Sequence, residues 1–129
     1  MEGINVWAVL VAAASAFLLG GLWYGPLFLK VWQRENGGPV QSGHPVKVFG
    51  GAFVLSLVAA AVFAAFLGPD PATLFATSAG FAAGLCWVAA SFGINYLFAQ
   101  RSLKLWLVDG GYHTLQFTLY GLVLGVWPW

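Results

Sequence analysis

Long apolar segments alternate with short polar ones along the whole chain. Four segments are long enough to cross the hydrocarbon core of a bilayer, which takes about 20 mostly apolar residues in a helix. None of the four carries a charge near its centre, and they are residues 4–28, 46–67, 72–98 and 103–127. The pattern predicts an all-α membrane protein whose four transmembrane helices form an antiparallel bundle, with residues 1–129 making a single transmembrane domain.

Helix-breaking and helix-capping residues mark the borders of these segments. Residues 68–71 should form a short turn in which Asp70 caps the third helix, and Ser102 is placed in the same way to cap the fourth. Pro26 lies near the end of the first segment, so we expect it to kink that helix. The connection that follows, residues 29–45, should begin with a short interfacial helix.

The composition is that of a membrane protein and not of a soluble domain. Hydrophobic residues make up 60% of the chain and charged residues only 7%, whereas a soluble domain carries about 25% charged residues. The net charge of +1 gives no strong field for nucleic acid, and no nucleic-acid partner is predicted. The single cysteine, Cys86, lies inside an apolar segment, where we expect it to be a buried packing residue.

The basic residues predict an orientation. All five Lys and Arg fall in the first and third connections or at their edges, and none lies near either terminus or in the second connection. They are Lys30, Arg34, Lys47, Arg101 and Lys104. Because cytoplasmic connections carry an excess of Lys and Arg, loops 29–45 and 99–103 should be cytoplasmic and both termini should lie outside.

Polar side chains form a stripe along the fourth helix. At about 100° per residue, Asp109, His113, Gln116 and Tyr120 fall within an arc of roughly 60°. An unpaired carboxylate at that depth costs roughly 3 kcal/mol on insertion scales, so Asp109 should face protein or water. Its expected partners are basic residues of the inner side: Arg101, Lys104, Lys30 or Arg34.

The same helix carries small residues on its opposite side. Gly111, Thr114, Thr118, Gly121 and Gly125 fall within an arc of about 80°. Small residues at this spacing let another helix backbone approach closely. The pairs Gly21–Gly25 and Gly80–Gly84 repeat the spacing, so we expect tight helix packing that includes self-association.

The third helix adds polar residues near the predicted depth of Asp109. Asn95 should lie close to it on the neighbouring antiparallel helix. We therefore predict a polar cluster inside the membrane, made of Asn95, Asp109, Arg101 and His113, with Tyr24 as a further member.

Several segments resemble the opening and closing motifs of the DUF1761 family, a group of small bacterial membrane proteins of unknown function. The resemblance implies four spans and a place in the bacterial inner membrane, and it brings no substrate. The chain departs from the family pattern at Gln100, where the family has Gly, and at Gly110, where it has Ala. The matching segments are Gly21 to Phe28 with Lys30 and Trp32, Asn95 to Phe98, Arg101 to Trp106, Asp109 to His113, and Gly121 to Trp127.

The two halves of the chain echo each other weakly. Tyr24, followed by Leu-Lys-Val-Trp at residues 29–32, is similar to Tyr96, followed by Leu-Lys-Leu-Trp at residues 103–106. Both stretches lie where a helix meets the predicted inner side. The echo would suit a duplicated helical hairpin, and chance explains it equally well.

Two classes of function fit these features. Asp109 and His113 could tie helices together, handle protons or ions, or, through His113, ligate a cofactor. One class is therefore a homo-oligomeric transporter for a small solute, ion or proton. The other is an accessory or scaffolding subunit of a larger membrane complex that contacts lipid, quinone or pigment. No paired carboxylates, catalytic triad or metal-ligand spacing is visible, so we predict no enzyme activity, no metal and no cofactor.

Overall fold

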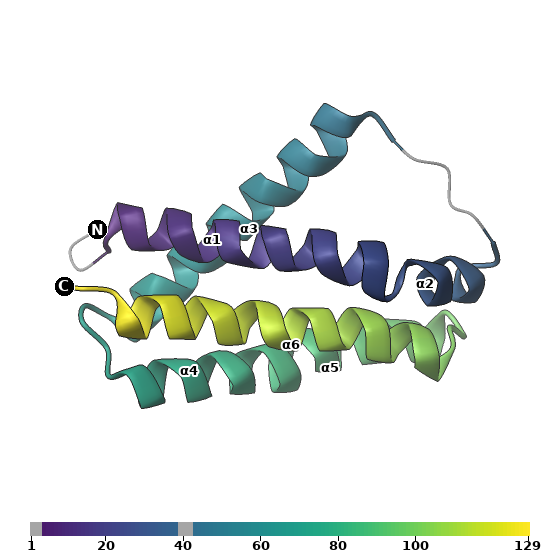
Figure 1. The fold of residues 1–129 in the computed structure, drawn as a ribbon. Helices are drawn as coiled ribbons and strands as arrows, with labels where there is room; N and C mark the ends of the chain where they lie inside the picture. Colours follow the sequence, from purple (N-terminus) through teal and green to yellow (C-terminus); the bar gives the residue numbers. More distant parts are fainter. Residues whose placement is uncertain (1–3, 39–42) are drawn as a thin grey trace.

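The computed structural model describes residues 4–38 and 43–129, and all the regular structure in them is helical (Figure 1). The helices α4, η2 and α5 follow one another without a break, and η1 and η2 are π-helical stretches. The elements are α1 Val6–Leu22, η1 Trp23–Leu27, α2 Leu29–Glu35, α3 Pro45–Leu67, α4 Thr73–Ala82, η2 Ala83–Ala89, α5 Ala90–Phe98 and α6 Leu103–Val126. The predicted all-α helical bundle is confirmed.

Three of the helical segments are long and apolar enough to cross a membrane. They are Val6–Leu27 with 22 residues, Pro45–Leu67 with 23 and Thr73–Phe98 with 26. Helix α6 has 24 residues, which at about 1.5 Å per residue is also enough to span the bilayer core. Because large apolar side chains remain exposed along all of these helices, the chain is a multi-pass membrane protein whose outer surface faces lipid.

Side-chain caps explain where several helices begin. The Asn5 side chain accepts hydrogen bonds from the backbone N–H groups of Trp7 and Ala8, and Ser102 accepts one from Leu105 at 3.1 Å. The predicted cap at Ser102 is therefore present. The predicted cap at Asp70 is wrong, because Asp70 lies in the preceding turn with φ of 48° and α4 begins only after Ala72.

The expected kink in the first helix is present. Gly25 leaves the helical region with φ of −106° and ψ of −106°, and the next residue, Pro26, has no N–H to donate. The chain turns there into α2. A second irregularity ends α5, where Gln100 adopts a left-handed φ of 57° and the N–H of Arg101 closes onto the carbonyl of Tyr96 at 2.8 Å. Glycine adopts that backbone conformation most easily.

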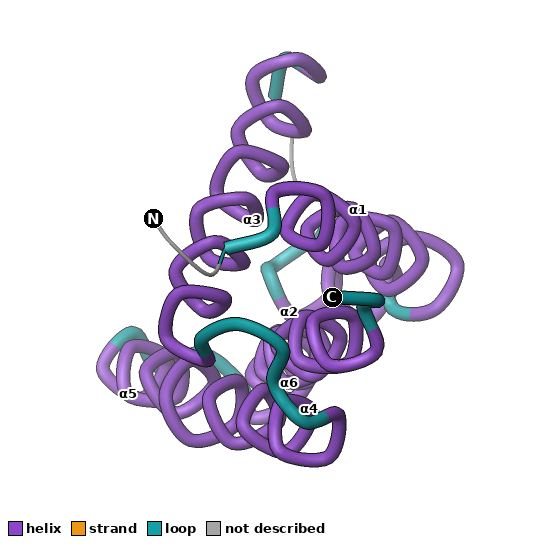
Figure 2. Tube along the Cα trace, turned by 90° about the vertical axis from the view of Figure 1, so that its left-hand side faces the viewer, coloured by secondary structure: helices purple, strands orange, loops and turns teal. Residues whose placement is uncertain are grey.

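The helices form an antiparallel stack from which one helix diverges. Both described ends of the chain and the α3–α4 turn lie at one end of the molecule, and α2 and the α5–α6 connection lie at the other (Figure 1). Helix α3 crosses α1 obliquely, and its N-terminal half stands away from the bundle (Figure 2). All of Pro45 to Ala52 is exposed, whereas Ser56, Ala60 and Ala64 are buried against α1 and α6.

Four glycines bring α6 into backbone contact with α4 and with the start of η2. A Cβ added at Gly121 would overlap the carbonyl group of Ala76, and one at Gly80 would overlap that of Phe117. At Gly84 and Gly125 the added Cβ would lie 2.6 Å from the His113 oxygen and 2.7 Å from the Thr73 Cα, respectively. The small faces of two neighbouring helices therefore pack on each other within one chain.

Thr114 and Thr118 belong to the same contact, since their Cα atoms border Gly84 and Gly80, and the Thr118 hydroxyl donates to the Thr114 carbonyl on its own helix at 2.7 Å. Gly111 instead faces the Trp23 ring. Gly21 and Gly25 make no such contact within the chain, because a Cβ at either position would meet nothing within 4 Å. Cys86 is exposed instead of buried, since it lies on the outer side of η2.

Candidate functional site

Asp109 lies inside the bundle between two tyrosines from different helices. Its side chain is buried, with 8% of its surface exposed. The Tyr24 hydroxyl, at the kink of the first helix, donates to Oδ1 at 2.5 Å. The Tyr96 hydroxyl, on α5, donates to the other oxygen, Oδ2. Two phenols thus satisfy the carboxyl group and tie three helices together at one point.

The expected ion pair of Asp109 with a basic residue is wrong. Within residues 4–38 and 43–129, the structure forms one ion pair, between Arg34 and the adjacent Glu35 at 3.4 Å. Lys104 precedes Asp109 by five residues, so it projects about 140° away around α6. Lys30, Arg101 and Lys104 are exposed, where long side chains keep their charge in water.

The other members of the predicted cluster also lie apart. Asn95 is exposed and makes no side-chain hydrogen bond with a described residue, while its neighbour Tyr96 reaches Asp109. His113 bonds to Gln116 and not to Asp109. Sequence reasoning missed Tyr96 as a site residue, although the echo between the two halves of the chain had placed Tyr24 and Tyr96 in matching positions.

A second set of hydrogen bonds runs through the polar stripe of α6. His113 Nδ1 lies 2.6 Å from Gln116 Oε1, and the Gln116 amide nitrogen donates to the Tyr120 hydroxyl at 2.7 Å. That hydroxyl lies 2.6 Å from Ser56 Oγ on α3, which donates in turn to the Ala13 carbonyl of α1 at 3.3 Å. The chain of bonds therefore joins α6, α3 and α1.

When His113 is neutral, this chain of bonds sets which ring nitrogen carries the proton. A carbonyl oxygen such as Gln116 Oε1 can only accept, so Nδ1 of His113 carries the proton and Nε2 keeps its lone pair. The ring also stacks on Phe92, with the ring centroids 4.7 Å apart and the planes 17° from parallel. Both interactions hold the imidazole in one orientation.

A cavity of about 630 Å³ opens beside this stripe. It lies where the N-terminal half of α3 diverges from α1, and α6 forms its third wall. Its size falls within the range of about 300–1,000 Å³ that is typical of small-molecule sites. Its lining is mostly apolar and comprises Phe17, Gly20, Gly21, Tyr24, Gly25, Val48, Phe49, Ala52, Leu55, Ser56, Tyr112, His113 and Gln116.

The cavity and the buried carboxyl share one residue. Tyr24 lines the cavity and donates its hydroxyl to Asp109, which is not itself among the lining residues. Tyr112, beside it, donates to the Ala16 carbonyl at 3.0 Å. The glycines at positions 21 and 25, which contact no other helix, leave open space on the α1 side.

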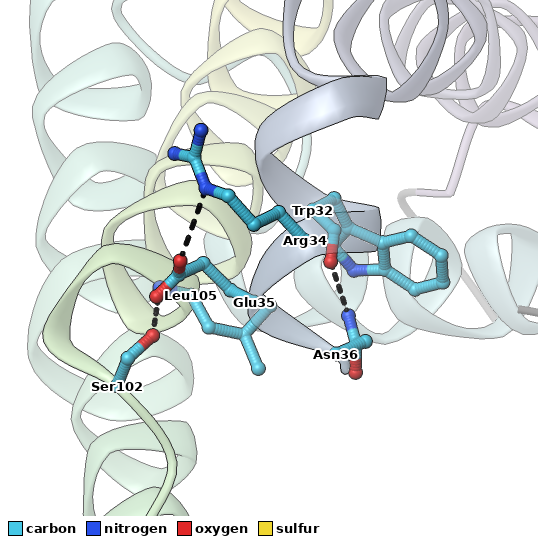
Figure 3. A network of polar contacts seen from close by, with 6 residues as sticks. All are labelled: Trp32, Arg34, Glu35, Asn36, Ser102 and Leu105. Atoms are coloured by element: carbon cyan, nitrogen blue, oxygen red, sulfur yellow. Dashed lines mark hydrogen bonds and ion pairs between the residues drawn. The ribbon is translucent and has the colours of Figure 1, made fainter. Parts of the chain in front are cut away.

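Helix α2 is attached to the start of α6 by polar contacts at the end of the bundle. Figure 3 shows Arg34 and Glu35 beside Ser102 and Leu105, at the first turn of α6. A hydrogen bond from the Ser102 hydroxyl, together with Arg34, lowers the pKa of the Glu35 carboxyl. The contacts fix the direction in which the chain leaves the kink at Gly25.

The described residues contain no group of three or more His, Cys, Asp or Glu side chains that could hold a metal ion. What the site can do is bind through apolar contact and a few hydrogen bonds. In the comparison with known families, the model described as "Protein of unknown function (DUF1761)" matches residues 7–125. No curated protein and no solved structure matches the chain significantly.

Proposed function

The chain belongs to the DUF1761 family of proteins of unknown function, and we propose that it is a transporter-like membrane protein that binds a small, mainly apolar solute between α1, α3 and α6. The observation that carries the proposal is the cavity of about 630 Å³ in the part of the bundle that α3 leaves open. A solute could enter it sideways from the bilayer, because every residue from Pro45 to Ala52 of α3 is exposed.

The lining favours a neutral solute over an ion. The described lining residues include no Lys, Arg, Asp or Glu, and the walls are apolar side chains of α1 and α3. An ion would lose its hydration shell there without gaining ligands, which is costly in an apolar site. Asp109 remains the candidate for proton handling, because it touches the cavity wall through Tyr24. We regard the protein as a binder without catalysis or a resident cofactor.

The orientation is part of the proposal. We place both termini outside the bacterial inner membrane and the ends that carry Lys30, Arg34 and Arg101 in the cytoplasm, because basic connections stay inside. A reporter that is active only outside the cytoplasm, fused after Trp129, should then be active. A fusion at the same site that is active only in the cytoplasm would overturn this orientation.

A side chain that fills the cavity should abolish binding of the solute without unfolding the protein. A side chain at Gly21 starts in open space beside the cavity, so Gly21→Phe should occupy it. We expect the purified wild type to retain added 4-octylphenol in native mass spectrometry and Gly21→Phe to lose it.

The matched control is Gly51→Phe. Gly51 also has nothing within 4 Å of an added Cβ and is not among the lining residues. This variant should retain the probe as the wild type does. Equal retention by wild type and Gly21→Phe would contradict the proposed site.

The accessory-subunit alternative rests on the divergence of α3. A helix of another protein could lie in the gap along the exposed residues Pro45 to Ala52. Copurification of a second polypeptide that protects this segment from labelling, at an introduced cysteine in a Cys86→Ser background, would favour it. Of the glycine pairs on which self-association was predicted, Gly80–Gly84 and Gly121–Gly125 are occupied by contacts within the chain, whereas Gly21–Gly25 is not, and the homo-oligomer stays a prediction.

A further inference from the structure

Almost every polar side-chain atom that lines the cavity already has a partner. The hydroxyls of Tyr24, Tyr112 and Ser56 donate to Asp109, to the Ala16 carbonyl and to the Ala13 carbonyl. Both polar atoms of the Gln116 amide are bonded, and so is His113 Nδ1. Among the described lining residues, His113 Nε2 is the one side-chain nitrogen or oxygen for which the structure shows no partner.

His113 lines the cavity, and its Nε2 is accessible. The one described side-chain polar atom that is both sealed from solvent and unpartnered is the Thr77 hydroxyl, so His113 Nε2 is not sealed. Since Nδ1 donates to Gln116, Nε2 of the neutral ring is an acceptor. The bond between Nδ1 and Gln116 and the stack on Phe92 hold the ring in this orientation. The largely apolar lining of the cavity therefore includes one residue, His113, whose side chain has an acceptor without a described protein partner.

We propose that the ligand of this cavity is a neutral, mainly apolar molecule whose single hydroxyl group donates a hydrogen bond to His113 Nε2. The inference rests on the proposed function, because it names the class of solute bound at that site. A hydroxyl satisfies the vacant acceptor, whereas an ether or hydrocarbon of the same size leaves it unpaired. Sites that bond a ligand hydroxyl discriminate against the analogue that lacks it for this reason.

Two probes of nearly equal size test the inference. 4-Octylphenol carries the donor, and 4-octylanisole replaces its hydrogen with a methyl group. With full-length protein in detergent, we expect the phenol to bind roughly five- to tenfold more tightly, as one hydrogen bond predicts. The Gly21→Phe variant should bind neither, and Gly51→Phe should bind both as the wild type does.

Histidine ¹⁵N spectra show the bond directly. The chain has two histidines, and His44 serves as an internal reference because its Nδ1 accepts from the Val46 N–H, which gives it the opposite tautomer. At about pH 8.5, above the ordinary imidazole pKa of about 6.5, the unprotonated Nε2 of His113 should shift upfield with 4-octylphenol and stay in place with 4-octylanisole.

The outcomes separate the two proposals. A shift at His113 with the phenol alone, absent in Gly21→Phe, supports both. Equal binding of the two probes in the cavity, with no shift at Nε2, overturns the hydroxyl inference and leaves the proposed site standing. Binding of neither probe, or binding that Gly21→Phe does not reduce, overturns both.

Discussion

Replacing Gly121 with leucine should prevent the protein from folding into a stable bundle, and replacing it with alanine should already lower the free energy of unfolding. A Cβ at this position would overlap the Ala76 carbonyl, which belongs to the backbone of α4 and cannot rotate away. Overpacking of this kind costs roughly 1–3 kcal/mol when neighbours can shift. Leucine adds three more carbons at the same contact, so α4 and α6 would have to separate.

The measurement is the free energy of unfolding in mixed micelles, titrated with SDS. The control is Gly21→Ala, since Gly21 also lies within a helix but has nothing within 4 Å of an added Cβ. Alanine is favoured over glycine in a helix interior by about 1 kcal/mol, so this variant should equal or exceed the wild type in stability. A Gly121→Ala variant as stable as Gly21→Ala would contradict the backbone contact.

Spacing alone predicted small-residue faces but not their partners. Gly80–Gly84 and Gly121–Gly125 each pack against the backbone of a neighbouring helix within the chain, whereas Gly21–Gly25 has the same spacing and borders a cavity. The difference comes from the angle at which α3 leaves α1, which depends on contacts made across the whole bundle. For the same reason no sequence pattern indicated the cavity, although Ser56 and His113 both line it.

For the buried carboxyl of Asp109 too, the sequence pattern predicted the position but not the partner. Periodicity correctly placed Asp109 inside the bundle, but its partner on the preceding helix is Tyr96 and not Asn95. A regular α-helix was assumed for the whole third span, whereas η2 interrupts it with a π-helical stretch at Ala83–Ala89. A π-bulge adds a residue to the turn, which rotates the following face by about 100°. Tyr96 thereby takes the inward position, and Asn95 is exposed.

The predicted ion pair between Asp109 and a Lys or Arg does not form, and the reason is energetic. An ion pair with Asp109 would have required a Lys or Arg to leave water, and the attraction inside a protein often fails to offset that cost. Two phenols satisfy the same oxygens and bring apolar rings into the bundle. Tyrosine is therefore the better partner at this depth, which the sign of the charges alone could not indicate.

Removal of both phenols should destabilise the protein more than any other change at this site. Tyr24→Phe and Tyr96→Phe each take one hydrogen bond from Asp109, and we expect each to lower the free energy of unfolding by about 1–3 kcal/mol. The double variant leaves the buried carboxyl with neither donor, so its loss should exceed the sum of the two.

A double-mutant cycle isolates the interaction from the packing of the rings. In an Asp109→Leu background the phenols have no carboxyl to bind, so Tyr24→Phe should then change the stability by only a few tenths of a kcal/mol. Tyr112→Phe is the matched control, because its hydroxyl donates to the Ala16 carbonyl and should cost about the same in both backgrounds. If Tyr24→Phe has the same effect with and without Asp109, the two groups do not interact and the carboxyl is held by something else.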